Sequence, residues 1–565
     1  MNSVLQIIYN QIQKRPKSPA LFSYVSNTYH PMSYLDMGLT AQQLSQWMAM
    51  HCDSGNRIII WSTNNWQWAI TDLAAQLCGA ISIPLYPTTG NDQLDYILSD
   101  ASPSIVFVDT LTNARLSTLS KISGLKKVIV FDDKRPENAP DLVLRFSDTL
   151  SETTKPNTLN TPQWITNRLD DTLTILYTSG TTGTPKAVPL THNNIVQNFL
   201  GLQDIIPISH TDSSLSFLPL SHIFERTVGF YCVLGVGAAI YYATSMDTVA
   251  HDLLNAKPTF IISVPRLYEK IHAKVMQTTG VKKSILKLAL CIGKQFKKGH
   301  WLWAIAHRLV FSSIHQKTGG NVRFLVSGGA ALSPHIEEFF NAIGLPVVQG
   351  YGLTETSPII SANLDQTIGS VGKVLPNVQL NVLPDTEIAV KGPSVFSGYL
   401  NVSNTDTFTD DGFFKTGDCG YVDDHGYLFI TGRKKELIVL SNGKNVPPTH
   451  IEDTLSQSDL IHQVMVIGNE RPYLTALIVP EIKVIEDKLR MVHSDPSFDA
   501  SAKKLILSDI AHQSSALASF ETVKKIALIY DAFSIDGTEL TPTLKLRRKI
   551  INKKYHDLIN SLYDD

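Results

Sequence analysis

Residues 177–186 read Tyr-Thr-Ser-Gly-Thr-Thr-Gly-Thr-Pro-Lys, and they directly follow the β-like run Thr-Leu-Thr-Ile-Leu that begins at Thr172. Glycines allow a loop to fold around an anion so that successive backbone N–H groups point at phosphate oxygens. The hydroxyl groups add hydrogen-bond donors, and Lys186 adds a positive charge. The stretch therefore predicts a loop that holds the phosphates of a nucleotide.

This loop has two alternative interpretations, a P-loop and an ordinary turn. Its order differs from the GxxxxGK[ST] pattern of a P-loop NTPase, because the gap between Gly180 and Gly183 is too short. A Ser/Thr/Gly turn between a strand and a helix is common in proteins. An ordered match over a whole loop is rarely accidental, so the nucleotide is favoured.

Bulk properties exclude several classes of protein. The chain has 565 residues, too many for one hydrophobic core, so we expect two or more domains. Its formal net charge of −2 gives no reason to expect nucleic-acid binding. The five cysteines are scattered without a CxxC pair, which suggests neither a zinc site nor a disulfide framework. Residues 1–24 lack a basic region followed by an apolar one, so we expect no secretion signal and a cytoplasmic protein.

Short β-like runs alternate with helical patterns up to about residue 400, which predicts α/β layers with buried sheets. Examples are the runs 57–62, 80–85, 104–108, 127–131 and 260–264. The uncharged run 227–244 approaches the length of a membrane span, but two glycines divide it. We expect a buried helix followed by a strand there. The polar, proline-containing region 132–161 is expected to be a surface connection.

The pattern changes near Gly432. Residues 420–430 read as a β-hairpin with its turn at 424–426, and a smaller unit of normal domain size follows. We therefore place a domain boundary at this point.

Five further motifs occur along the chain: 218–226 (Leu-Pro-Leu-Ser-His-Ile-Phe-Glu-Arg), 327–332 (Ser-Gly-Gly-Ala-Ala-Leu), 349–356 (Gln-Gly-Tyr-Gly-Leu-Thr-Glu-Thr), 416–418 (Thr-Gly-Asp) and 540–546 (Leu-Thr-Pro-Thr-Leu-Lys-Leu). With the 177–186 loop, they resemble the motifs of the ANL adenylate-forming superfamily. Residues 218–226, 263–270 and 541–549 look most like its long-chain fatty acyl-CoA synthetase branch. The resemblance implies the ANL fold: a large N-terminal domain of layered α/β sheets over 1–432 and a small, mobile α+β C-terminal domain over 433–565.

Several of these residues suit nucleotide chemistry by type. Tyr351, between two glycines, offers an aromatic face for stacking. Glu355 offers a hard oxygen ligand for Mg²⁺, and Thr354 a hydroxyl for the α-phosphate. A lone Thr-Glu pair would more often cap a helix, but the surrounding octapeptide favours the site. Asp418 can accept both hydroxyls of a ribose, and Arg433 supplies a cation for the ribose or α-phosphate.

The resemblance assigns a role to each matching residue. Lys545, Glu355 and Thr354 are implied in catalysis, with Glu355 as the metal ligand. The implied nucleotide-binding residues are Thr178, Ser179, Gly180, Thr181, Thr182, Gly183, Lys186, Gly328, Gly329, Ala330, Gln349, Gly350, Tyr351, Asp418 and Arg433. His222 is implied to line the acyl tunnel, Gly443 the CoA channel, and Lys435 the hinge. A lone histidine would more often be structural. Many relatives have a glycine two residues after the lysine that matches Lys545, whereas Arg547 stands there here.

The resemblance implies activation of a fatty acid with Mg·ATP to acyl-AMP and pyrophosphate, followed by thioester formation with CoA. The nearest alternative passes acyl-AMP to a carrier protein, and a luciferase-like oxidation is a more distant one. A rival from another class is a catalytically silent nucleotide- or lipid-binding scaffold. Its signature would be the loss of Lys545, Glu355 or Asp418, and all three are present. The sequence does not indicate chain-length preference or oligomeric state.

The segment 270–317 is strongly basic, with nine Lys, one Arg and no Asp or Glu. On a helical wheel, Lys283, Lys287, Lys294 and Lys298 share one face, opposite Ile285, Leu288, Ala289, Ile292 and Phe296, and two tryptophans follow. Such a helix is suited to the surface of an anionic membrane, which predicts peripheral contact through 281–303 on the inner face of a membrane. A helix packed on the core with a solvated lysine face fits equally well.

Overall fold

The strand that precedes the glycine-rich loop, β8 (Thr172–Ser179), belongs to a seven-stranded sheet in the order β7-β6-β5-β3-β4-β8-β9. The other strands are β3 (Arg57–Trp61), β4 (Ile81–Leu85), β5 (Ile105–Val108), β6 (Lys127–Val130), β7 (Val143–Arg145) and β9 (Pro185–Thr191). All neighbours pair in parallel except β8 and β9. The connecting helices include α3 (Trp66–Cys78), α4 (Asn91–Ala101) and α5 (Asn113–Leu119). Parallel strands with helical crossovers put both faces of this sheet in the interior.

The computed structural model describes residues 3–135, 139–166, 168–179, 184–203, 205–534, 537–540 and 546–564. The chain divides into two units. Unit 1 comprises Met1–Leu332, Ile336–Leu380 and Val390–Phe414, and unit 2 comprises Ser333–His335, Asn381–Ala389 and Lys415–Asp565.

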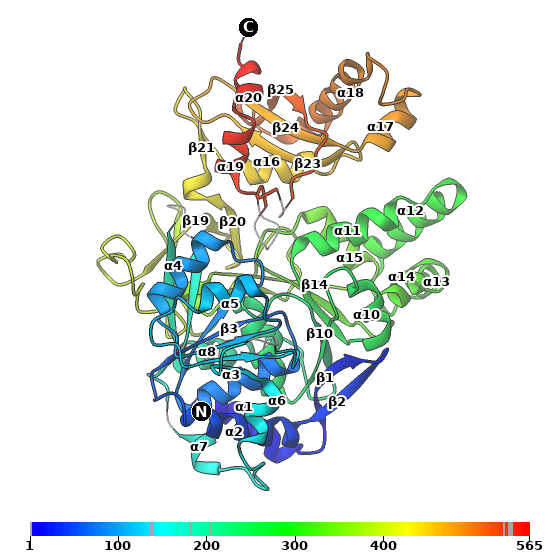
Figure 1. Cartoon of the computed structure of the whole chain (residues 1–565). Coiled ribbons are helices and arrows are strands. Elements are labelled where there is room, and N and C mark those ends of the chain that lie inside the picture. The colour runs from blue at the N-terminus through cyan, green and yellow to red at the C-terminus, as the bar shows by residue number, and fades with distance from the viewer. Residues whose placement is uncertain are drawn as a thin grey trace. The chain divides into compact units, whose positions relative to one another are not determined.

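Unit 1 contains a second, nine-stranded sheet in the order β16-β15-β14-β13-β12-β10-β11-β1-β2 (Figure 1). Its strands are β1 (Pro19–Val25), β2 (Thr28–Ser33), β10 (Ser213–Ser216), β11 (Ala239–Tyr242), β12 (Phe260–Ser263), β13 (Phe324–Ser327), β14 (Val347–Gly352), β15 (Ile359–Asn363) and β16 (Lys373–Val374). The helices around it include α1 (Val4–Lys14), α2 (Tyr34–Ala49), α8 (His192–Gln203), α10 (Val249–Ala256), α11 (Pro265–Met276), α12 (Gly280–Gln295), α13 (Trp301–Ala306), α14 (Ser312–Lys317) and α15 (Pro334–Ala342). The predicted α/β class is confirmed.

The uncharged run 227–244 forms the predicted helix and strand. A π-helix, η1 (Glu225–Cys232), continues into α9 (Val233–Val236), and β11 follows after Gly237, whose φ of +88° ends the helix. Every residue of η1 is buried. Among the described residues, no helix has the length and apolar character needed to cross a bilayer.

The segment 132–161 is more than a surface connection, so that expectation was wrong in part. It contains β7, at the edge of the seven-stranded sheet, and α6 (Phe146–Ser151). Val143 and Phe146 are both buried, and the Phe146 ring packs edge-on against Phe131. Two well-placed apolar side chains were enough to anchor a polar segment to the core.

Unit 2 is built mainly on a three-stranded sheet, β23 (Ile461–Ile467), β24 (Leu474–Pro480) and β25 (Val523–Leu528). Alternate side chains of β23 and β24 enter separate apolar clusters on the two faces. One cluster includes α16 (Pro448–Leu455) and α18 (Phe498–Gln513), and the other includes α19 (Arg548–Lys554) and α20 (His556–Ser561). A further sheet contains, in order, β17 (Gln379–Val382), β18 (Glu387–Lys391), β19 (Phe414–Val422) and β20 (Leu428–Arg433), and its last two strands are the predicted hairpin.

Candidate active site

The predicted phosphate loop joins two antiparallel strands, rather than the strand and helix of an ordinary turn of this composition. Thr178 of β8 pairs directly with Lys186 of β9 at the base of the loop. Gly180, Thr181, Thr182 and Gly183 lie outside the described residues, as does the side chain of Ser179. The hairpin therefore fixes the two ends of the loop, one of which carries the predicted cation.

Tyr399 connects Lys186 to Glu355, the predicted metal ligand. The Lys186 ammonium nitrogen is 4.3 Å from the ring centroid of Tyr399, a cation–π contact. The Tyr399 hydroxyl donates a hydrogen bond of 2.7 Å to Glu355 Oε1. Glu355 is buried in the single-turn helix η3 (Thr354–Thr356). Motifs more than 160 positions apart in the sequence thus converge on one place within unit 1.

The segment around Tyr399 is held by its neighbours. The Asn401 side chain accepts a hydrogen bond from the Ala187 N–H at 3.0 Å and donates one to the Pro185 carbonyl at 3.2 Å. The Phe396 N–H donates to the Glu355 carbonyl at 2.8 Å. Sequence reasoning missed Tyr399 and Asn401, since neither stands in a glycine-rich or charged motif.

The two other glycine motifs sit at the ends of neighbouring strands, because β13 precedes Gly328 and β14 contains Gly350. A Cβ atom on Gly328 would lie 2.7 Å from the Phe224 ring, so only glycine fits. Gly329 has a φ of +81°, and Ala330 is exposed. Parallel strands bring these loops to the same edge of the nine-stranded sheet.

The Gln349 side chain is buried, and both ends of its amide group are hydrogen-bonded. Its amide nitrogen donates to Glu337 Oε2 at 2.8 Å, and its oxygen accepts from the Leu332 N–H at 3.4 Å. Burial raises the pKa of Glu337 to about 7. The Gln349 side chain therefore supports the Gly328–Leu332 loop, and its nucleotide contact stays a prediction.

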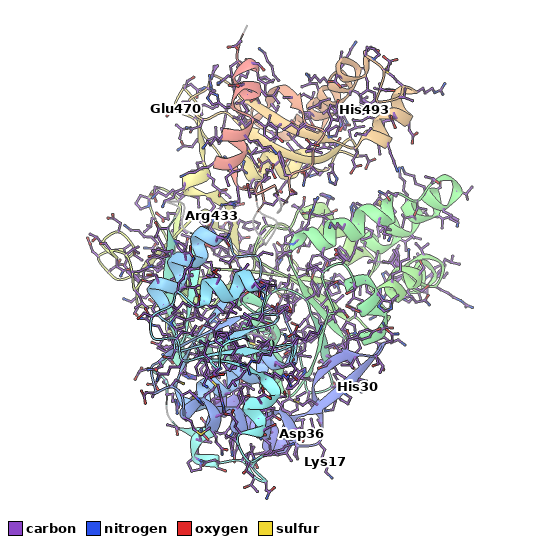
Figure 2. The ribbon with its side chains drawn as sticks, in the orientation of Figure 1. Lys17, His30, Asp36, Arg433, Glu470 and His493 are labelled. Atoms are coloured by element: carbon purple, nitrogen blue, oxygen red, sulfur yellow. The ribbon has the colours of Figure 1, made fainter. Side chains whose placement is uncertain are left out.

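Asp418 and Arg433 face each other within unit 2. They are directly opposite in the β19–β20 register, and the Arg433 Nε lies 2.7 Å from Asp418 Oδ1. Asp418 is buried, whereas the Arg433 side chain is 47% exposed at the end of β20 (Figure 2). The next residue, Lys434, binds Asp385 and Glu387, and these two carboxylates raise the pKa of the ammonium group.

The remaining predicted residues of unit 2 come from separate stretches of the chain. Lys435 is exposed in the short helix η4 (Lys434–Glu436), directly after β20. Gly443 occupies the turn between β21 (Ile438–Val439) and β22 (Asn445–Val446), with a φ of +78°. Lys545 lies outside the described residues, although its neighbour Leu546 forms an antiparallel bridge with Leu540.

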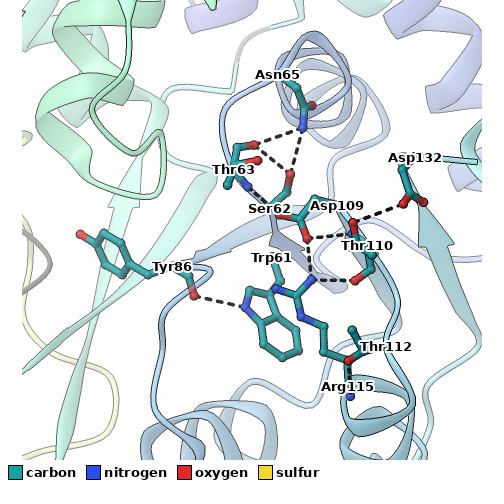
Figure 3. Close-up of polar contacts among 10 residues, drawn as sticks. All are labelled: Trp61, Ser62, Thr63, Asn65, Tyr86, Asp109, Thr110, Thr112, Arg115 and Asp132. Atoms are coloured by element: carbon teal, nitrogen blue, oxygen red, sulfur yellow. Dashed lines mark hydrogen bonds and ion pairs between the residues drawn. The ribbon is translucent and has the colours of Figure 1, made fainter. Parts of the chain in front are cut away.

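The segment that carries His222 is anchored by Asn64. The Asn64 side chain donates to the Leu218 carbonyl at 2.7 Å and accepts from the Leu220 N–H at 2.9 Å. Asn64 follows Thr63, whose N–H donates to the Asp109 carboxylate at 3.1 Å (Figure 3). The Asp109 carboxylate is also paired with Arg115 at 2.5 Å. No sequence motif contains Asn64, and its partners are distant along the chain.

Glu225 follows closely after His222 and is fully buried in η1. It accepts a hydrogen bond from Ser216 Oγ at 2.6 Å, and Asn64 donates to the same hydroxyl at 3.0 Å. Burial raises the pKa of the Glu225 carboxyl from 4.5 to about 8. The carboxyl is therefore uncharged at neutral pH.

This raised pKa predicts a pH dependence of stability. Between pH 4.5 and 8 the folded state keeps a proton on Glu225 that the unfolded state releases. Wild-type stability should therefore fall as pH rises through this range, by up to about 1.4 kcal/mol per pH unit relative to Glu225→Gln. Urea unfolding of both proteins from pH 4 to 9 measures the difference, and parallel curves would show that Glu225 ionises normally.

Two protein families match the chain. Residues 8–400 match the family described as AMP-binding enzyme, and residues 435–565 match the AMP-binding enzyme C-terminal domain. The long-chain-fatty-acid–CoA ligase FadD15 of Mycobacterium bovis is 33% identical over 92% of this chain and 89% of its own length.

A chloroplastic long-chain-fatty-acid–[acyl-carrier-protein] ligase of Arabidopsis thaliana, AEE15, is 29% identical over 90% of this chain and 79% of its own length. Among solved structures, the adenylation domain of a carboxylate reductase from Mycobacterium chelonae superposes with a TM-score of 0.80 at 21% identity, covering 100% of this chain and 91% of that one. At this identity the structural likeness concerns the fold.

Proposed function

The chain belongs to the AMP-binding enzyme family, and from this we propose that it activates a long-chain fatty acid with ATP and then transfers the acyl group to CoA. The observation that carries the proposal is the convergence of Lys186, Tyr399 and Glu355 beside the phosphate-loop hairpin. The similarity to a long-chain-fatty-acid–CoA ligase along almost the whole chain supports the substrate class.

The reaction consists of two transfers. In the first, a carboxylate oxygen of the fatty acid attacks the α-phosphorus of ATP, the bond to the β-phosphate oxygen breaks, and acyl-AMP and pyrophosphate form. In the second, the CoA thiol loses its proton and attacks the acyl carbonyl, the bond to the phosphate oxygen breaks, and AMP leaves. Both transfers depend on positioning and on neutralising charge that develops on oxygen.

For the first transfer, each predicted residue has a proposed task. Lys186 and the 178–183 loop hold the β- and γ-phosphates, and Thr354 binds the α-phosphate. The adenine lies between Tyr351 and the loop that contains Gly328, Gly329 and Ala330. Gln349 and Gly350, directly before Tyr351 on β14, line the same place. Asp418 and Arg433 bind the ribose.

The residues around Glu355 fit a bound Mg²⁺. A buried carboxylate with one oxygen hydrogen-bonded to Tyr399 retains lone pairs for the ion, which would neutralise phosphate charge. Lys545, from the C-terminal domain, is proposed to contact the reacting carboxylate and the α-phosphate.

For the second transfer, the C-terminal domain is proposed to turn about Lys435. One arrangement of charged groups cannot favour both attacks, and a hinge lets Lys545 leave while the Gly443 loop lines a channel for CoA. We place the boundary between residues 432 and 433. The interval between the two family matches, which end at residue 400 and begin at residue 435, supports a boundary in this region.

The acyl chain is proposed to enter unit 1 at a small apolar cavity, which has room for about one water molecule and must widen to admit the chain. The cavity is lined by Leu202, Ile206, Phe224, Val228, Val326, Val348, Gly350, Ile359 and Ala362. It lies beside Gly350 of the adenine motif and Phe224 of the His222 segment. His222, half-buried in the middle of the 218–226 segment, is proposed to control access.

ATP–pyrophosphate exchange over a series of fatty acids tests the adenylation step. We expect exchange that depends on a long-chain acid, and AMP release that depends on CoA. The similarity to the acyl-carrier-protein ligase is the observation behind the carrier-protein alternative, and phosphopantetheinylated carrier in place of CoA separates the two. No exchange with any fatty acid would contradict the proposal.

We also propose that the segment 281–303 contacts an anionic membrane, where lipid substrates reside. The predicted apolar face of α12 was displaced: Leu286 and Ala289 face the core, whereas Ile285 and Leu288 are 46% and 65% exposed. Val281, Trp301, Ile305 and Leu309 add further exposed apolar side chains nearby in the sequence. Figure 1 shows α12 and α13 at the periphery of unit 1. Exposed apolar groups among lysines favour a bilayer surface over a merely solvated helix face.

Co-sedimentation with vesicles tests this contact. The wild-type protein should sediment with vesicles that contain anionic lipid and not with purely zwitterionic ones. Lys283→Glu combined with Lys287→Glu should weaken binding at least tenfold, because each lysine near the surface contributes about 1 kcal/mol. Lys121→Glu with Lys126→Glu makes the same charge change elsewhere on unit 1 and should bind normally. Equal loss in both double variants would leave only a nonspecific charge effect.

A further inference from the structure

Arg226, at the start of the π-helix η1, is fully buried and uses its whole guanidinium group. It forms an ion pair with Asp72, which is also fully buried. Its other hydrogen bonds reach Thr174 Oγ1 at 2.7 Å, Ser82 Oγ at 2.6 Å and the Tyr231 hydroxyl at 3.0 Å. Such a network is costly to assemble in a core, since each desolvated group must find a partner.

Three of these four partners of Arg226 belong to the other sheet layer of unit 1, whereas Tyr231 lies on η1 itself. Asp72 lies on α3, Ser82 on β4 and Thr174 on β8, all part of the seven-stranded layer. Arg226 lies on η1, which follows β10 of the nine-stranded sheet. Ser82 and Thr174 are paired in register, and Thr174 Oγ1 donates to the Ser82 carbonyl at 2.6 Å. One side chain therefore joins η1 to two adjacent strands of the opposite sheet.

Both ends of this connection lead to the candidate site. Thr174 precedes Thr178, at the base of the phosphate loop, by four residues of the same strand, about 13 Å at the usual rise per residue. On the other side, the Arg226 N–H donates to the His222 carbonyl at 3.0 Å. A polar path between the phosphate-loop strand and the acyl segment thus runs through Arg226.

A contribution to stability would not by itself explain the buried ion pair of Arg226 and Asp72. Replacing a buried ion pair by apolar side chains of similar volume is often neutral or stabilising. A fixed distance between two sheets is a different requirement, because an acyl carboxylate held by one layer must meet a phosphate held by the other. Misplacement by about 1 Å can lower a reaction rate by about a hundredfold.

We propose that Arg226 is a positioning residue that sets the His222 segment against the strand carrying the phosphate loop. This inference rests on the proposed function, since it assigns the two segments to the acyl group and to ATP. Arg226 contacts neither substrate and acts through Thr174 and Asp72.

Thr174→Val is the most direct test, because valine keeps the shape of threonine and removes only the hydroxyl that Arg226 contacts. Arg226→Lys is the second variant. Both should lower kcat of fatty-acid-dependent pyrophosphate exchange by roughly ten- to a hundredfold. The dissociation constants of a nonhydrolysable ATP analogue and of the fatty acid, measured separately, should change less than threefold.

Asp212→Asn is the matched control. It breaks an ion pair with Arg323 in unit 1, within the nine-stranded sheet layer, and should lower the thermal midpoint while keeping kcat within twofold. If Thr174→Val also keeps kcat within twofold, Arg226 serves stability only and the proposal is overturned. An inactive wild-type protein would instead contradict the proposed function itself.

Discussion

Replacing Lys545 with alanine is expected to abolish acyl-AMP formation while largely sparing thioester formation from supplied acyl-AMP. The ammonium group is proposed to neutralise the negative charge where the carboxylate meets the α-phosphate. These two anionic groups approach each other only in the first transfer. Removing one such preorganised group typically lowers a rate by about 10²–10³. In the second transfer Lys545 is proposed to be away from the reacting atoms, so its loss should matter little.

Two assays separate these steps. Pyrophosphate exchange reports adenylation, and AMP release from synthetic acyl-AMP with CoA reports thioester formation. Lys553→Ala removes a different lysine of unit 2, which is exposed on α19, and should leave both rates unchanged. Comparable losses in the two assays for Lys545→Ala would argue against a hinge that withdraws the lysine.

Glu355→Gln is expected to produce the second largest effect. Glutamine keeps the shape of the side chain and can still accept the hydrogen bond from Tyr399, but it removes the charge proposed to bind Mg²⁺. Adenylation should fall by about 10²–10³, as for other groups that stabilise developing charge. The Mg²⁺ concentration for half-maximal exchange should rise in parallel.

Tyr399→Phe is the matched control for Glu355. It keeps the ring beside Lys186 and removes the hydroxyl that donates to Glu355. The loss of one such bond is worth about 1 kcal/mol, or roughly fivefold in rate. A Mg²⁺ dependence of Glu355→Gln that matches the wild type would exclude Glu355 as the metal ligand.

The parts of the fold that were predictable from sequence share a local cause. Buried strands such as β3 and β12 are continuous apolar runs, and the 420–430 hairpin has a turn composition that allows one arrangement. The glycine motifs were recognisable because close approach excludes side chains, as the Phe224 ring does at Gly328.

The parts that were missed depend on distant partners. Arg226 reads in sequence as one more polar residue after His222, yet it is buried because Asp72 is brought to it by another sheet. Arg548 similarly stands between two other basic residues in the sequence, but it pairs with Glu452 at 2.5 Å and is largely buried. The face of α12 was misjudged because a helical wheel shows which residues share a side, not which side meets the core.

The central claim is that a fatty carboxylate attacks the α-phosphorus of ATP and leaves as a thioester. A fatty acid labelled with ¹⁸O in both carboxylate oxygens tests this directly. After turnover with ATP and CoA, the account predicts one ¹⁸O atom in each AMP and none in pyrophosphate, because the attacking oxygen stays on the α-phosphorus when the thiol cleaves acyl-AMP. Unlabelled AMP, or label in pyrophosphate, would contradict it.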